Sequence, residues 1–355
     1  MKVGIIGKPG SGKSTLFHTL TRGHEQVSHT KEPVHGVVVV PDPRFDYLVE
    51  LYHPKKVTPG TIDFVDDVAR IGGEHGREFS DEAMGELRAT DAMALIINAF
   101  EPETADPAAV RTEAVSFLEE IALRDLMLIE NRLERMAKQS RSPQSGQALQ
   151  IEKGALEKLK KSLEAGERFA DISLDESEKR AVAGFQLLTA KPLVVAVNVA
   201  EGEVAEADEK YSQARSYLDG LGIAAFCLSA DLERQVAELD EADQADFLVE
   251  LGITEPVRDK LIRAIYSSCH LVTFFTVGEK EVHAWPIPRA STALEAADSI
   301  HSDLARGFIR AEVISYGDVH AHGGWDEAKA AGRMRLVGKE HVIEDGDCLY
   351  IRFKV

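Results

Sequence analysis

The segment 7–15, GKPGSGKST, constrains the fold of this chain more than any other part of the sequence. It matches the pattern GxxxxGK[ST], a glycine-rich loop whose backbone N–H groups surround phosphates. An apolar run, residues 3–6, precedes the motif, and Leu16, Phe17 and Leu20 follow it with helical spacing. The motif is specific in this order of strand, loop and helix, so the sequence predicts a nucleoside triphosphate site.

Each residue type in the motif has a separate task. Glycines allow the tight turn, and Lys13 reaches the β- and γ-phosphates. The hydroxyl of Ser14 is placed to bind Mg²⁺, and the positive end of the following helix favours the same anion. The predicted phosphate-binding residues are Gly10, Ser11, Gly12, Lys13, Ser14 and Thr15.

Length and composition exclude several classes of protein. A chain of 355 residues predicts two or three domains. It has no apolar run long enough for a transmembrane helix, and a core strand that begins within three residues leaves no room for a signal peptide. Three scattered cysteines favour a reducing, cytoplasmic location. The net charge of −19 argues against non-specific nucleic-acid binding, so an RNA contact needs a local basic patch.

Apolar runs that alternate with helical patterns predict an α/β fold, a doubly wound and mostly parallel sheet. Strands are expected at residues 37–40, 61–65, 92–100, 193–198 and 224–229, and helices at 44–52, 79–89 and 248–268. The β-branched run 37–40 predicts a buried strand.

A heptad pattern interrupts the sheet domain. Leucine, isoleucine and methionine recur by threes and fours at Leu126, Ile129, Leu133, Met136, and again at Leu156, Leu159 and Leu163. A turn-like stretch, 140–147, separates the two runs, so we expect an antiparallel coiled coil inserted at 118–185. Its arms carry a local excess of basic residues: Arg124, Arg132, Arg135, Lys138, Arg141, Lys153, Lys158, Lys160 and Lys161. The excess is compatible with RNA contact or with a solvated helical surface.

Short strands around one helix, which is expected near residues 294–304, dominate from residue 271 onward. They predict a small β-grasp domain at 271–355, after a nucleotide-binding domain at 1–270.

Four further positions complete the predicted nucleotide site. Asp63 ends a strand, where a carboxylate can hold a magnesium-bound water, and Thr30 is placed as a switch threonine. The predicted metal ligands are thus Ser14, Thr30 and Asp63. The loop 198–201 lies where base recognition is expected, and Ser229 with Ala230 follow the next strand as a second base contact. Histidines near these loops, His35 among them, are expected at the loop surface, and His320 with His322 lack a third metal ligand.

The order of elements resembles a translation-factor-class GTPase, and more narrowly the YchF/Obg-like ATPase family. Three stretches carry the resemblance: VVVVPDPRFDYLVELYHPKKVTPGTIDFVD, LSADLERQVAELDEADQADFLVELGI, and FFTVGEKEVHAWPIPRASTALEAADSIHSDLARGFIRAEVISYGD continuing to DGDCLYIRFKV. The resemblance implies a cytosolic nucleotide switch with a helical insertion, a C-terminal TGS domain of β-grasp fold, and ribosome association.

The base loop favours ATP over GTP. GTPases usually have NKxD, whose aspartate accepts hydrogen bonds from guanine, whereas this chain has Asn198, Val199, Ala200 and Glu201. The carboxylate of Glu201 lies one methylene further out, and the backbone of Val199 can instead pair with adenine. In the family that the sequence resembles, NxxE accompanies ATP preference.

The catalytic residue is not identified by the sequence. The family's DxxG reads Asp63-Phe64-Val65-Asp66, so Asp66 either brings a carboxylate toward the γ-phosphate or points to solvent. The loop 100–107 has no histidine, which leaves Glu101, Glu103 or Asp67 as candidate bases. Three hypotheses stay open: an ATPase switch, a nucleotide-gated binding protein with negligible turnover, and a GTPase.

Overall fold

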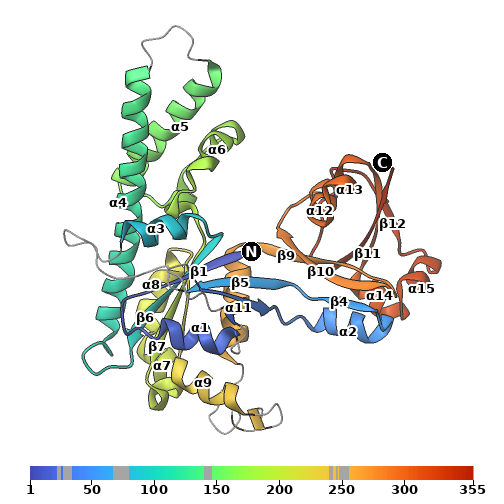
Figure 1. Cartoon of the computed structure of the whole chain (residues 1–355), viewed down its shortest axis with the longest axis horizontal. Helices are drawn as coiled ribbons and strands as arrows, with labels where there is room; N and C mark the ends of the chain where they lie inside the picture. The colour runs from blue at the N-terminus through green and yellow to red at the C-terminus, as the bar shows by residue number, and fades with distance from the viewer. Residues whose placement is uncertain are drawn as a thin grey trace. The chain divides into compact units, whose positions relative to one another are not determined.

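The computed structural model describes residues 1–21, 25–26, 34–66, 80–139, 146–239, 243–244, 247 and 256–354. The chain forms two compact units (Figure 1). The first contains residues 1–36 and 63–257, and the second contains 37–62 and 258–355. The division at residue 270 that the sequence suggested differs from these units, because the segment 37–62 lies with the C-terminal part.

The first unit is built on a seven-stranded sheet of order β2-β3-β5-β1-β6-β7-β8. Its strands are β1 (Lys2–Ile6), β2 (Glu25–Gln26), β3 (Val34–Val39), β5 (Thr61–Asp66), β6 (Ala92–Ala99), β7 (Leu193–Val199) and β8 (Ala224–Leu228). β1 pairs in parallel with β5 and β6, and β6-β7-β8 continue in parallel. β2 runs antiparallel to β3. The prediction of a mostly parallel α/β sheet is confirmed.

The first unit contains the helices α1 (Lys13–Thr21), α3 (Asp81–Arg88), α4 (Pro107–Gln139), α5 (Gln147–Glu164), α6 (Glu176–Val182), α7 (Val204–Lys210), α8 (Ser212–Gly220) and α9 (Ala230–Glu238). Of these, α5 and α6 belong to the helical arm and not to the sheet core. Short 3₁₀ turns follow α5 and β7: η2 (Phe169–Asp171), η3 (Ala183–Phe185), η4 (Leu188–Ala190) and η5 (Glu201–Glu203). The core joins side chains such as Leu95 and Val195 of the sheet to Phe117 of α4 and Tyr211 before α8.

α4 and α5 form the predicted helical arm, and they lie side by side in Figure 1. Ile129 and Met136 of α4 pack with Leu156, Leu159 and Leu163 of α5, as the heptad pattern predicted. α4 begins well before residue 118, so its N-terminal half is part of the sheet domain. Although α4 has 33 residues, no described helix is apolar enough to cross a membrane.

Two expectations about local structure are wrong. The run 37–40 is not fully buried, because Val38 is 3% exposed whereas Val37 and Val39 are 58% and 46% exposed. This alternation is typical of a strand with only one covered face. The helix expected near residues 294–304 is two helices, divided at His301, whose ring accepts a hydrogen bond from the N–H of Asp303.

The second unit is built on a six-stranded sheet of order β12-β11-β13-β9-β10-β4. Its strands are β4 (Lys56–Thr58), β9 (Leu271–Thr276), β10 (Glu281–Pro288), β11 (Phe308–Ser315), β12 (Arg335–Val337) and β13 (Asp347–Phe353). Its helices are α2 (Pro43–Tyr52), α11 (Val257–Ser268), α12 (Ala293–Ile300), α13 (Ser302–Arg306), α14 (Tyr316–His322) and α15 (Trp325–Ala330). α12 packs on one face of the sheet in the β-grasp manner. Residues 248–255 of the helix expected at 248–268 lie outside the described residues.

α2 covers the other face of this sheet. Phe45 and Leu48 pack against Phe275, Val282 and Cys348. β4, which follows α2 in the chain, pairs in parallel with β10. The segment 37–62 is therefore a structural part of the C-terminal fold, although more than two hundred residues separate α2 from β9 in the sequence.

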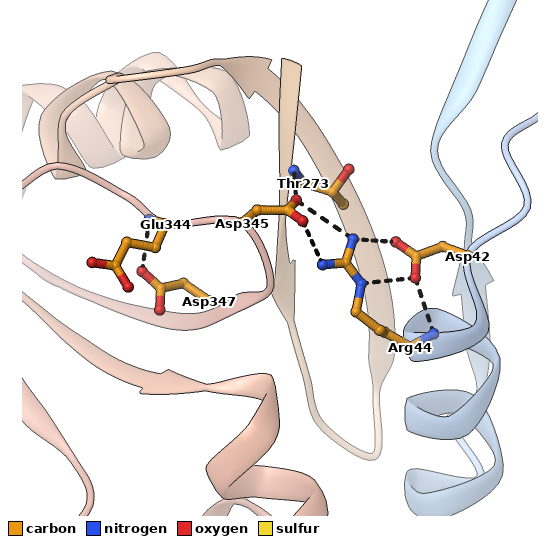
Figure 2. Close-up of polar contacts among 6 residues, drawn as sticks. All are labelled: Asp42, Arg44, Thr273, Glu344, Asp345 and Asp347. Carbon is orange, nitrogen blue, oxygen red and sulfur yellow. Dashed lines mark hydrogen bonds and ion pairs between the residues drawn. The ribbon is translucent and has the colours of Figure 1, made fainter. Parts of the chain in front are cut away.

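Arg44 holds the start of α2 in place (Figure 2). Asp42 caps the helix by accepting a hydrogen bond from the Arg44 N–H at 2.9 Å, and it also accepts from the guanidinium at 2.9 and 2.7 Å. The same guanidinium contacts Asp345 at 2.7 Å, and Asp345 accepts from the N–H of Thr273 at 2.8 Å. The hydrogen bonds that Arg44 donates to Asp42 raise the pKa of Arg44, so its guanidinium is charged at any ordinary pH.

Replacing Arg44 by alanine should lower the free energy of unfolding of the second unit by about 2 kcal/mol, because the mostly buried carboxylate of Asp42 and the exposed one of Asp345 lose a charged donor. Both tryptophans of the chain, Trp285 and Trp325, lie in this unit, so tryptophan fluorescence during urea unfolding reports on it. The matched control is Arg306→Ala, since Arg306 forms an exposed pair with Asp303 and should contribute less than about 0.5 kcal/mol. Equal midpoints for the two variants would show that the network does not stabilise the unit.

Candidate functional site

The loop between β1 and α1 has the backbone that a phosphate cradle needs. Gly10 and Gly12 have φ angles of +73° and +88°, in the region that favours glycine. A Cβ on Gly12 would also clash with the side-chain amide of Asn198. Glycine is thus required at position 12 by its φ angle and by the close approach of Asn198. At position 10 it is required by the φ angle alone, because nothing lies within 4 Å of a Cβ built there.

Lys13 begins α1 and folds back over the loop. Its ammonium group donates hydrogen bonds to the carbonyl oxygens of Gly7 and Lys8, both at 2.9 Å. The positive charge therefore lies beside the N-terminus of α1, where the helix dipole also attracts anions. Ser14 is exposed in the first helical turn, and Thr15 is half-buried behind it.

Asn198 connects three parts of the predicted site. It ends β7 with 4% of its surface exposed. Its Nδ2 donates to the carbonyl of Ser11 at 2.9 Å, and its Oδ1 accepts from the N–H of Ala230 at 2.9 Å. The phosphate loop and the start of α9 are thereby fixed to the carboxyl edge of the sheet.

The second base-contact segment is used within the fold. Ser229 is buried and caps α9 by accepting from the N–H of Leu232, at 3.4 Å. The N–H of Ala230 is bound to Asn198. The polar groups that sequence analysis assigned to base recognition here therefore have structural partners.

Glu201 is held near α9 by a residue that no sequence pattern identified. Its Oε2 accepts from Nε2 of Gln235 at 2.8 Å. Both lie at the surface, while the side chain of Val199 is buried at the end of β7. Val199 therefore turns its side chain into the core next to Asn198, and the Glu201 carboxylate follows one turn later.

Asp63 is the described carboxylate of the predicted metal site. It lies in β5, and Nδ1 of His35 in β3 lies 3.1 and 3.3 Å from its two oxygens. The sequence predicted His35 at a loop surface. In the structure it is a strand residue that contacts Asp63, the candidate metal ligand. Ser14 and Asp63 offer a hydroxyl and a carboxylate oxygen, and this donor set fits Mg²⁺. Thr30 lies outside the described residues.

Asp66 does not point to solvent. It ends β5 and is 8% exposed, so that alternative is wrong. Glu101 and Glu103 are exposed, and Asp67 lies outside the described residues. The hydroxyl of Ser11 is a further buried polar group, for which the described part of the chain provides no hydrogen-bond partner.

The described residues contain no group of three or more histidine, cysteine or acidic side chains arranged for a metal. His320 packs instead between two tyrosines. Its ring centre lies 4.4 Å from that of Tyr47 and 5.7 Å from that of Tyr316.

Known proteins match this chain along its whole length. The family model YchF-GTPase_C, described as a protein of unknown function, matches residues 271–354, and MMR_HSR1, described as a 50S ribosome-binding GTPase, matches residues 2–132. "Ribosome-binding ATPase YchF" of Bacillus subtilis is 36% identical over 366 residues, which cover 100% of both chains. "Obg-like ATPase 1" of Oryza sativa is 32% identical over 100% of this chain and 92% of its own.

A solved structure has the same fold. The "Schizosaccharomyces pombe YchF GTPase" superimposes with a TM-score of 0.85 at 26% identity, over 99% of this chain and 97% of that one. The names of these relatives differ between ATPase and GTPase.

The Gly12→Ala variant should bind a nucleoside triphosphate about 150- to 900-fold more weakly, because about 1–2 kcal/mol of backbone strain adds to two hydrogen bonds of Asn198 worth about 1 kcal/mol each. Gly10→Ala is the matched control, since it introduces the strain without the clash and should lose about tenfold. Calorimetric titration of both folded variants measures the difference. Equal losses would mean that the contact between Gly12 and Asn198 is irrelevant to the site.

Proposed function

Because the chain belongs to the YchF family, we propose that it is an Mg²⁺-dependent ATPase that acts as a nucleotide switch in the cytoplasm and associates with the ribosome. The observation that carries this proposal is the phosphate loop with Lys13 at the start of α1, tied through Asn198 to the base-recognition loops. The full-length similarity to proteins named ribosome-binding ATPases supports it.

The loop and α1 bind the triphosphate. Backbone N–H groups around Gly10 and Gly12 surround the phosphates, and Lys13 exchanges its two carbonyl contacts for phosphate oxygens. Ser14 and Asp63, with Thr30, would hold Mg²⁺, which neutralises charge on the β- and γ-phosphates. His35 orients the Asp63 carboxylate for this task.

We propose that the base site prefers ATP, with GTP as the weaker ligand. Guanine recognition in NKxD needs an aspartate directed at the base edge, whereas the Glu201 carboxylate is longer and is bound to Gln235. The backbone N–H and C=O of Val199 match the N1 and amino group of adenine. Ser229 and Ala230 shape the pocket from the other side, since their polar groups hold α9 and Asn198.

A second candidate is a nucleotide-gated binding protein with negligible turnover. The burial of Asp66 at the end of β5 favours it, because a carboxylate in the position of the switch glycine repels the γ-phosphate. The loop 100–107 offers only exposed carboxylates in place of a histidine.

We also propose that an RNA contact of the arm uses the cations Lys138, near the end of α4, and Lys161, in the last turn of α5. Most other arm cations are neutralised within the first unit. The pairs are Arg124–Glu120, Arg132–Glu152, Lys153–Glu157, Lys158–Glu178 and Lys160–Glu130. Lys138 and Lys161 are exposed and form no ion pair with the part of the chain that the structure describes.

Lys13→Ala should abolish ATP binding and phosphate release, because a charge-assisted contact contributes about 1.5–3 kcal/mol and its loss leaves the phosphates under-neutralised. Phosphate release is measured at saturating ATP and GTP, with and without ribosomes. Lys8→Ala is the control, since Lys8 lies in the same loop but pairs with Glu113 at 3.4 Å. Release that stays negligible in the unmodified chain under every condition would favour the gated binding protein.

Restoring the guanine-reading aspartate should reverse the base preference. In the Glu201→Asp variant, which keeps the buried Val199, GTP should bind at least tenfold tighter relative to ATP than in the unmodified chain, since a paired charged hydrogen bond exceeds about 1.4 kcal/mol. Side-by-side titrations give the ratio, with Glu203→Asp as the control on the same turn. Tighter GTP than ATP in the unmodified chain would overturn the proposed preference while leaving the site intact.

A further inference from the structure

The first unit contains a second candidate site, away from the nucleotide loops. It is a cavity of about 520 Å³, lined by α3, by the middle of α4 and by η3. Its floor is apolar and consists of Met84, Met127, Leu128 and Phe185. Met84 is almost fully buried, whereas Met127 is 40% exposed, and Leu123, one turn earlier on α4, is 55% exposed. A large apolar surface therefore faces solvent at this point.

The rim of the cavity carries one sign of charge. Four arginines line it, namely Arg88, Arg124, Arg132 and Arg135. Among the described residues, no aspartate or glutamate lines it. Three of these four guanidinium groups are ion-paired with acidic residues outside the lining, so Arg135 supplies the unneutralised positive charge in a chain with a net charge of −19. We call this surface the arginine groove.

Three of the guanidinium groups are fixed by carboxylates that lie outside the lining. Arg88 pairs with the fully buried Asp125 at 2.7 Å, and it also donates to the carbonyl of Gln186 at 3.2 Å. Arg124 and Arg132 pair with acidic residues of the arm, Glu120 and Glu152. Because a guanidinium has five N–H donors, Arg132, whose side chain is 32% exposed, can bind a further acceptor.

Arg135 completes the rim and differs from the other three. It is exposed and forms no ion pair within the described ranges of the chain. Its charge is therefore available to a ligand. Lys138 lies less than one turn further along α4, is equally exposed, and does not line the cavity.

We propose that the arginine groove binds an acidic, amphipathic segment of a partner protein. Its carboxylates pair with the arginine rim, and its apolar side chains fill the floor around Met127. Methionine and arginine are both enriched in protein interfaces, and methionine adapts to different apolar partners. A nucleic-acid backbone matches the rim but has no group for the apolar floor, so the floor favours a protein segment over RNA. The proposal is independent of nucleotide binding.

The probe is a fluorescein-labelled helical peptide of about 18 residues, five turns, with leucine at i, i+3 and i+4 positions and glutamate elsewhere. Fluorescence anisotropy is recorded with the full chain. Arg135→Glu and Met127→Asp should each weaken binding at least tenfold, since the first removes the free cation and the second places a carboxylate in the floor. Lys138→Glu is the matched control and should change affinity less than twofold. A peptide with lysine for every glutamate should not bind.

Methyl NMR locates the contact without any variant. The peptide should shift the methyl signals of Met127 and Met84 and leave that of Met136, buried in the arm, unchanged. If Arg135→Glu and Lys138→Glu weakened peptide binding equally, the effect would come from the overall charge of the arm, and the proposal would be overturned. A second outcome would also overturn it: the peptide does not bind, a uridine oligonucleotide does, and Arg135→Glu abolishes the binding of the oligonucleotide. The groove would then be a nucleic-acid site.

Discussion

The nucleotide site depends on one side-chain amide. Asn198 lies at the carboxyl edge of the sheet and binds the Ser11 carbonyl with one end and the Ala230 N–H with the other. These two segments are otherwise separate loops, each of which ends in a helix. The amide sets the distance between the loop proposed to hold the phosphates and the segment proposed to contact the base. Gly12 is needed for this contact as much as for the phosphate turn, since any side chain there displaces the amide.

The second unit is organised by the same physical means. A polar side chain at a helix start, Arg44, satisfies carboxylates on two segments that are far apart in the sequence, and one of them also binds the backbone of β9. The arm adds a related case, because its cations are largely bound by carboxylates within the same unit. Local charge in the sequence therefore overstates the charge that the arm presents to a partner. The same holds for three arginines of the arginine groove, and Arg135 is the one lining cation without an ion pair among the described residues.

Features that depend on neighbouring residues were predictable from the sequence. The phosphate loop, the parallel strands and the heptad seam each follow from a short pattern, and the structure contains all three. Features that depend on distant pairs were not. No pattern identified Gln235 as the partner of Glu201, or His35 as the partner of Asp63. The sequence also did not predict that residues 37–62 belong to the C-terminal unit. The amphipathic pattern of α2 predicts a helix with one buried face, but it does not indicate which sheet that face covers.

The long separation between α2 and its sheet has a consequence for synthesis of the chain. Arg44 and Asp345 are 301 residues apart, which corresponds to roughly 15–60 s of translation. During this interval Phe45 and Leu48 have emerged without the strands that cover them. The nascent chain thus carries exposed apolar side chains until the last strand is made, a state that favours misassembly and chaperone binding. Translation that stops before residue 271 leaves this surface permanently uncovered.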